Sequence, residues 1–401
     1  MATVYNKALN CKIKVERILG KINGSLSGPT IVFFGGIHGN ETSGIFALQE
    51  VLKGINSNYL NGAVYAISGN LKALEKNQRY LDEDLNRLWT KDKIQIIKNK
   101  AVLNADETEL LELLDILESI LKTNQPPFYF IDLHTTSSKS LPFITINDAL
   151  INRKFAKHFP VPIVLGIEEY LNGPLLSYIN ELGYVSLGFE SGQHDTKSAI
   201  INHIAFINLA LVFSGILKMD EVVDYSKFYW QLKNKSKQTF DVFEVVYLYK
   251  IQQYDSFMML NRFKSFQKIT KGTKLAIHNR FEVTSRYNGS IFMPLYQKKG
   301  VEGFFIIRPI KPFFLRLSML LRRGKVDGWL VFLPGVSWLN KNEGVLRVDL
   351  KVARYFAKSF FHLLGYRNKQ ITRTHLRLNN RERVAKSSMY RNESWYRGFK
   401  L

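Results

Sequence analysis

The sequence predicts an open α/β sheet flanked by helices, followed by a smaller, mostly β region and a basic, helical C-terminal tail. Up to about residue 218, short apolar runs alternate with amphipathic helical stripes, which is the pattern of an open α/β sheet. From about residue 219 the segments become shorter and strand-like, and an Asn288-Gly289 turn separates two of them. We therefore expect three domains, covering residues 1–218, 219–345 and 346–401.

Each expected strand of the first domain is a short apolar run, and each expected helix has one apolar side. The strands are expected at 31–34, 63–67, 128–133, 144–146, 161–165 and 185–189. The helices are expected at 42–55, 147–158, 174–182 and 198–218, with one more that starts in a capping box at Asp106 and Glu109. The connection 68–106 has little periodicity. In the rest of the chain we expect strands at 242–249, 274–277, 281–284, 290–294 and 304–307, and helices at 313–321 and 350–364.

Composition and charge limit the classes of function. The chain is 46% hydrophobic and has no run of about 18 uncharged apolar residues. These two properties indicate a globular protein without a transmembrane segment. The single cysteine, Cys11, excludes an internal disulfide, and the charged first twenty residues do not resemble a signal peptide, so we expect a cytoplasmic protein. The formal net charge is +22, and residues 351–401 contribute thirteen Lys and Arg against two acids, a net of +11. We interpret this segment as an appended basic tail.

The stretch 31–41 combines an apolar strand with a glycine-rich turn. His38 and Glu41 lie three residues apart in this turn, and both side-chain types bind zinc well. Glycines at 35, 36 and 39 allow the backbone to fold tightly enough to direct both side chains at one point. His134 and Glu190 also follow apolar strands, and ligands of open α/β sheets bind beyond the carboxyl ends of the strands.

Four motifs, in order along the chain, resemble the succinylglutamate desuccinylase and aspartoacylase family, which belongs to the zinc carboxypeptidase-like hydrolases. They are Gly35-Gly36-Ile37-His38-Gly39-Asn40-Glu41, then Arg79-Tyr80 with Asp84-Leu85-Asn86-Arg87, then Asp132-Leu133-His134, and Glu190 before Gly192-Gln193-His194. The resemblance covers roughly residues 30 to 305. It implies a zinc-carboxypeptidase-like sheet and one Zn²⁺ per chain, bound by His38, Glu41 and His134 with a fourth position open for water.

The resemblance also implies a role for each remaining candidate. Glu190 acts as the general base, and Arg79 stabilises the oxyanion. Substrate binding falls to Asn86, Arg87 and Tyr296, with the arginine holding the substrate carboxylate through a bidentate fork. Asp132 is expected to orient a ligand or an arginine, and His194 either fixes a loop by a hydrogen bond or supports the site. Tyr296 is nearly as well explained by packing within the β domain.

The expected activity is hydrolysis of the acyl-amide bond of a small N-acyl amino acid of the N-acetylaspartate or N-succinylglutamate type. A metallocarboxypeptidase would share the ligands and the base but needs an open groove for peptides. A polyanion- or nucleic-acid-binding protein is the other alternative, because the tail interleaves basic and aromatic residues at Arg391, Trp395, Tyr396 and Arg397. The acyl group, the amino acid and the formation of a homo-oligomer stay open.

Overall fold

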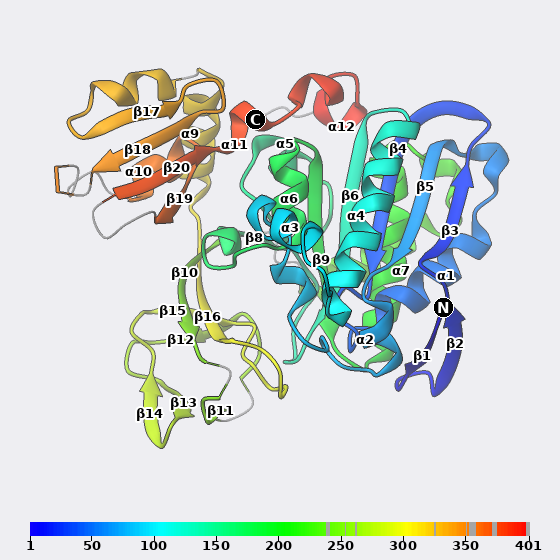
Figure 1. Ribbon diagram of the computed structural model, residues 1–401. Coiled ribbons are helices and arrows are strands. Elements are labelled where there is room, and N and C mark those ends of the chain that lie inside the picture. Colours follow the sequence, from blue (N-terminus) through cyan, green and yellow to red (C-terminus); the bar gives the residue numbers. More distant parts are fainter. Residues whose placement is uncertain are drawn as a thin grey trace.

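The structure is a computed structural model. It describes residues 1–237, 241–252, 254–260, 263–324, 326–349, 351–352, 358–370 and 375–397. An eleven-stranded mixed sheet lies at its centre, with helices on both faces (Figure 1). Within the described ranges, no helix combines the length and the apolar character that crossing a membrane requires.

The strands of the central sheet come from most of the chain. In spatial order they are β12 (Gln267–Ile269), β15 (Gly289–Phe292), β16 (Glu302–Pro309), β10 (Val242–Lys250), β8 (Ile163–Leu165), β7 (Phe143–Ile146), β9 (Val185–Gln193), β6 (Phe128–Thr136), β4 (Leu26–Gly35), β5 (Asn61–Ser68) and β3 (Ile18–Asn23). Three smaller sheets contain β1 (Ala2–Asn6) with β2 (Cys11–Val15), β11 (Phe257–Met259) with β13 (Lys274–His278) and β14 (Phe281–Thr284), and β17 (Val336–Asn340), β18 (Val345–Asp349), β20 (His375–Asn380) and β19 (Tyr366–Gln370). This confirms the expected fold class.

The helices are mostly short. They are α1 (Ser43–Gly54), α2 (Leu71–Glu75), α3 (Lys91–Lys98), α4 (Ala105–Thr123), α5 (Leu150–Ala156), α6 (Leu175–Glu181), α7 (Lys197–Phe213), α8 (Tyr225–Lys235), α9 (Pro312–Arg323), α10 (Lys358–Leu363), α11 (Arg381–Val384) and α12 (Ser394–Arg397).

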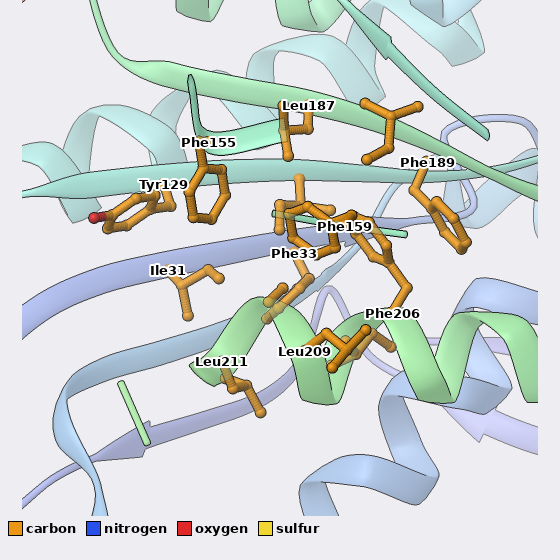
Figure 2. Packing of buried hydrophobic residues seen from close by; sticks show 14 of the residues in the cluster. Ile31, Phe33, Tyr129, Phe155, Phe159, Leu187, Phe189, Phe206, Leu209 and Leu211 are labelled. Atoms are coloured by element: carbon orange, nitrogen blue, oxygen red, sulfur yellow. The ribbon is translucent and has the colours of Figure 1, made fainter. Parts of the chain in front are cut away.

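Strand β4 is buried on both faces, as its continuous apolar run predicts. Ile31 and Phe33 point into one hydrophobic cluster, and Val32 and Phe34 point into another. Figure 2 shows the first cluster, in which Ile31 and Phe33 lie on the side of β4 that faces α7, the helix of Phe206, Leu209 and Leu211. Helix α4 contributes to the second cluster. The strand that leads into the His38 turn is therefore fixed from both sides.

Strands β4, β6 and β9 are adjacent and parallel. Their carboxyl ends therefore meet at one edge of the sheet, and each is followed by polar residues that the sequence singles out. Strand β7 joins β9 in the antiparallel direction, and β10 joins β8 in parallel. The sheet thus continues without interruption past residue 218, and the division into the expected domains stays a prediction.

The C-terminal segment differs from the expected helical tail. Strand β20 pairs with β18 on one side and with β19 on the other, both antiparallel, and only short helices, α10 to α12, lie in the described part. Two aromatic side chains beyond β20 are buried in the main core: Tyr390 donates a hydrogen bond to the Phe128 carbonyl at 2.5 Å, and Trp395 Nε1 donates to Tyr129 Oη at 2.9 Å. The segment is therefore part of the packed molecule, although it is strongly basic.

The connection 68–106 is more ordered than its sequence suggests. It contains α2 and α3, which are too short to show a clear period. The capping box of α4 also differs from the expected pair, because Asn104 caps the helix and Glu107 bonds back to the Asn104 N–H. Asp106 has a different role, described below.

Candidate active site

The turn after β4 brings His38 and Glu41 together. Gly36 has φ +72°, and a Cβ on Gly39 would lie 2.1 Å from the Ala73 carbonyl carbon, so both positions favour glycine. The Glu41 N–H donates to the His38 carbonyl at 3.1 Å, which closes a tight turn before α1. His38 Nδ1 then lies 2.8 Å from Glu41 Oε1.

His134 completes a buried cluster with these two residues. Its Nδ1 lies 2.9 Å from Glu41 Oε2, and the Thr135 N–H donates to the same oxygen at 2.8 Å. One ligand atom from each of His38, Glu41 and His134 lies within 4.8 Å of the other two, and all three residues are buried. Two imidazoles and a carboxylate at this spacing can hold a metal ion.

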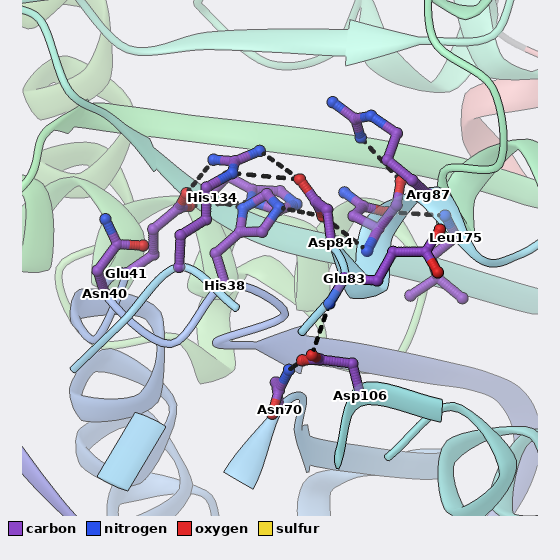
Figure 3. Close-up of polar contacts among 12 residues, drawn as sticks. His38, Asn40, Glu41, Asn70, Glu83, Asp84, Arg87, Asp106, His134 and Leu175 are labelled. Atoms are coloured by element: carbon purple, nitrogen blue, oxygen red, sulfur yellow. Dashed lines mark hydrogen bonds and ion pairs between the residues drawn. The ribbon is translucent and has the colours of Figure 1, made fainter. Parts of the chain in front are cut away.

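A carboxylate lies at the outer nitrogen of each imidazole. His38 Nε2 is 3.1 Å from Asp84 Oδ1 (Figure 3). His134 Nε2 is 2.6 Å from Asp132 Oδ2. With the proton on Nε2 of each imidazole, each Nδ1 keeps a free lone pair that points toward Glu41. A histidine needs such an unprotonated nitrogen to bind a metal ion. Burial lowers the pKa of His134, but Asp132 and Glu41 outweigh it and raise that pKa well above its ordinary value.

Glu190 lies beside the cluster without being part of it. It is opposite His134 in the register of β6 and β9, so both side chains leave the sheet on the same face. Burial is the main cause of a raised pKa for this carboxyl, with Glu41 and Asp132 adding to it. Within the described part of the chain, its Oε2 has no hydrogen-bond partner. A buried carboxylate that is exposed only to a cavity can accept a proton there.

Asp106 anchors the loop that carries Arg79 and Arg87. This carboxylate accepts the backbone N–H groups of residues 81, 82 and 83 at 3.2, 2.6 and 3.0 Å, and the Asn70 amide at 2.5 Å. Figure 3 shows Asp106 beneath the segment that contains Glu83 and Asp84. Three backbone donors on one carboxylate fix the loop conformation.

The two arginines of this loop reach the site and are already paired. Arg79 donates two hydrogen bonds to Asp84 Oδ2, at 3.2 and 3.0 Å, and its Nη1 lies 3.6 Å from Glu41 Oε1. Arg87 donates from Nε and Nη2 to Glu302 Oε1 at 3.2 and 2.9 Å. Asn86 Oδ1 accepts the Leu175 N–H at 2.8 Å, so this amide also anchors α6.

The structure brings most of the candidates into one cavity of about 120 Å³. The candidates that line it are His38, Glu41, Arg79, Asn86, Arg87, His134, Glu190 and His194. His194 bonds Thr135 Oγ1 through Nδ1 at 2.6 Å and Gln297 through Nε2 at 3.3 Å, and burial lowers its pKa. Asp132 is fully buried behind His134.

Tyr296, like Asp132, does not line this cavity. Its side chain is 40% exposed, and its hydroxyl accepts the Phe263 N–H at 2.7 Å. The sequence reasoning in turn missed Asp84, Asp106 and Glu302. Asp84 belongs to the Asp-Leu-Asn-Arg motif, which offers a signal for it. Glu302 lies 215 residues from its partner Arg87, so no local pattern points to it.

Comparisons with known proteins find similarity to one family. The family model described as "Succinylglutamate desuccinylase/Aspartoacylase catalytic domain" matches residues 27–204. The chain is 28% identical over 163 residues to a probable aspartoacylase of Acaryochloris marina, covering 38% of this chain and 52% of that protein. It is 37% identical over 65 residues to succinylglutamate desuccinylase of Ectopseudomonas mendocina, covering 16% of this chain and 19% of that protein. The chain thus spans about half or less of the length of these curated relatives.

Solved structures show the same fold. A succinylglutamate desuccinylase/aspartoacylase from Rhodobacter sphaeroides superposes with a TM-score of 0.55 at 15% identity, over 77% of this chain and 94% of that chain. A succinylglutamate desuccinylase from Vibrio cholerae superposes with a TM-score of 0.53 at 14% identity, over 77% and 90%.

An α/β sheet here carries a buried His-Glu-His cluster and a neighbouring glutamate at its carboxyl edge. Residues 27–204, which contain these features, are similar to the catalytic domain of the succinylglutamate desuccinylase/aspartoacylase family.

Proposed function

We propose that the chain is a zinc-dependent amidohydrolase that cleaves the acyl-amide bond of a small N-acyl amino acid. The observation that carries this proposal is the position of Glu190. It lies opposite His134 of the His38, Glu41 and His134 cluster, on the same face of the sheet, and its Oε2 has no hydrogen-bond partner among the described residues. This is the arrangement of a general base that is not itself a ligand.

His38, Glu41 and His134 would hold the metal, one ion per chain. Their donor types and their mutual distances fit Zn²⁺, and the carboxylates at both Nε2 atoms fit the support that zinc-binding histidines receive. When bound, zinc supplies Lewis acidity and lowers the pKa of a coordinated water to about 7.

The chain's own residues supply the remaining chemistry. Glu190 accepts a proton from the attacking water and passes it to the leaving amine. The guanidinium of Arg79, fixed by Asp84, provides positive charge where the oxyanion develops. Arg87, with Asn86 beside it, holds the substrate carboxylate through the N–H groups that Glu302 leaves available. Asp132 fixes the His134 ring, and His194 fixes Thr135 at the cluster.

The cavity favours a small substrate over a peptide. Its space is about 120 Å³, and residues 293–305 of the β region, including Gln297 and Glu302, form part of its wall. A metallocarboxypeptidase needs an open groove in that position. The net charge of +11 in the sequence of residues 351–401 keeps nonspecific polyanion binding as a second candidate property, favoured by charge alone.

The test is a release assay with purified, zinc-loaded protein. We expect free amino acid from at least one member of a panel of N-acetyl, N-succinyl and N-formyl amino acids, and no release of C-terminal residues from peptides. Hydrolysis of peptides alone would establish the carboxypeptidase alternative. Hydrolysis of neither class would contradict an amidohydrolase of small substrates.

A further inference from the structure

The charged side chains of the described cavity lining leave no unpaired arginine for an anionic substrate. Among the described residues that line it, Arg79 and Arg87 are the only arginines, and no lysine is present. Each arginine has a carboxylate of its own, Asp84 for the first and Glu302 for the second. Glu168 lines the same cavity and accepts the Asp148 N–H at 3.1 Å. Positive charge within reach of a substrate is therefore already compensated.

Glu302 comes from β16, far from the loop that carries Arg87. The pair is mostly buried, with 17% of the Arg87 side chain and 15% of the Glu302 side chain exposed. Burial raises the pKa of Glu302, but Arg87 and Arg79 outweigh it and hold that pKa below its ordinary value. Glu302 thus stays negatively charged in the cavity wall.

Arg87 has limited hydrogen-bonding capacity left. Nε and Nη2 both donate to Glu302, and Nη1 donates to the Asn86 carbonyl at 2.8 Å. The outer N–H groups of Nη1 and Nη2 can still donate to one carboxylate. A second carboxylate on the substrate would lie in a cavity whose wall carries Glu302 and Glu168, and the described lining offers no further arginine or lysine to receive it. A neutral or positively charged side chain meets no such repulsion.

We propose that Glu302 makes the site selective for N-acyl amino acids that carry a single carboxylate and a neutral or positively charged side chain. This inference rests on the proposed amidohydrolase function and narrows its substrate class. It disfavours dicarboxylic substrates of the N-acetylaspartate and N-succinylglutamate types. Glu302 acts through Arg87 and through its own charge, so it is a residue of specificity and positioning rather than of catalysis.

The experiment compares two substrates of nearly the same shape, N-acetyl-L-asparagine and N-acetyl-L-aspartate. For the parent protein we expect kcat/KM to favour the asparagine derivative by about tenfold or more, because like charges in a closed site are costly. Glu302→Gln removes the charge and nearly keeps the shape. It should reduce this preference about tenfold, mainly through a lower KM for N-acetyl-L-aspartate.

Two further variants control the result. Glu302→Asp keeps the charge and should keep the preference for the asparagine derivative. Glu282→Gln removes a glutamate of the β region that pairs with Lys274 at 2.8 Å outside the cavity, and it should leave the preference unchanged. Calorimetric titration of the products, L-asparagine and L-aspartate, gives the same comparison without turnover.

The outcomes separate this inference from the function on which it rests. A parent protein that favours N-acetyl-L-aspartate, or a preference that Glu302→Gln does not alter, would overturn the role of Glu302 while leaving the amidohydrolase intact. Absence of hydrolysis for every N-acyl amino acid would contradict the proposed function itself. If Glu302→Gln does not fold, the parent preference and the Glu302→Asp variant still decide the inference.

Discussion

Glu190 lies directly opposite His134 where β9 runs parallel to β6. Neighbouring parallel strands direct opposite side chains to the same face, so the sheet itself places a carboxylate beside the imidazole. Glu190 and His134 both line one cavity. The strand register therefore places the proposed base next to a proposed metal ligand.

Glu190→Gln tests this separation. The amide keeps the shape of the side chain but cannot accept the proton, so kcat should fall by about 10²-fold to 10⁴-fold while the zinc content and KM change little. Steady-state kinetics and metal analysis of the same preparation provide both readouts. Loss of zinc would identify Glu190 as a ligand, and kcat within a few-fold of the parent would identify it as a bystander.

Asp106→Asn should loosen the loop that carries the two arginines. An amide cannot accept from the three backbone N–H groups as a carboxylate does, and loss of charge-assisted hydrogen bonds costs about 1.5–3 kcal/mol. We expect a lower denaturation midpoint and a raised KM, since Arg87 and Asn86 would no longer be held in place. Asp115→Asn, at an exposed position of the same helix, is the control. Equal effects of the two substitutions would rule out the anchoring role.

The C-terminal segment should be necessary for stability. Trp395→Ala removes a buried ring that packs on Tyr129 and Phe155, and such truncations cost about 3–5 kcal/mol. The matched control is Trp329→Ala, because Trp329 is 72% exposed. Thermal unfolding should show a much lower Tm for the first variant only. If both variants unfolded like the parent, the segment would be an appended tail after all.

His158 provides a pH-dependent contribution to stability. Burial lowers the pKa of this imidazole, which packs near Phe213. As the pH falls, the unfolded chain takes up the proton first, near pH 6.5, so this contribution is full above about 6.5 and decreases below it. His158→Gln does not titrate, and its unfolding free energy should therefore decrease less than that of the parent between about pH 7 and pH 5. Parallel decreases would contradict the assignment.

The sequence predicted the local parts of the site well, because these are short motifs at strand ends. The apolar run before His38 and the glycines around it are sufficient to predict a strand followed by a tight turn. The same holds for His134 and Glu190, each of which follows a buried strand.

The parts that the sequence did not predict depend on contacts between distant residues. Glu302 pairs with Arg87, which lies 215 residues away in the sequence. The sequence predicted that Asp106 starts a helix, but in the structure its carboxylate anchors a loop. Strand β20 has the sequence HLRLNN, and most of its polar residues lie on the face that points away from the core. Because the segment is polar and basic, its sequence did not indicate a strand that pairs with β18. For Tyr296 the local motif left substrate binding and packing within the β domain open, and in the structure its hydroxyl accepts the Phe263 N–H outside the cavity lining.

Metal analysis tests the central claim most directly. We expect the purified parent protein to contain about one zinc per chain, Glu190→Gln to contain the same amount, and His134→Ala to lose it, because two remaining ligands bind zinc poorly. Circular dichroism of His134→Ala shows whether the fold is retained. Full zinc retention by a folded His134→Ala protein would contradict the proposed ligand set of His38, Glu41 and His134.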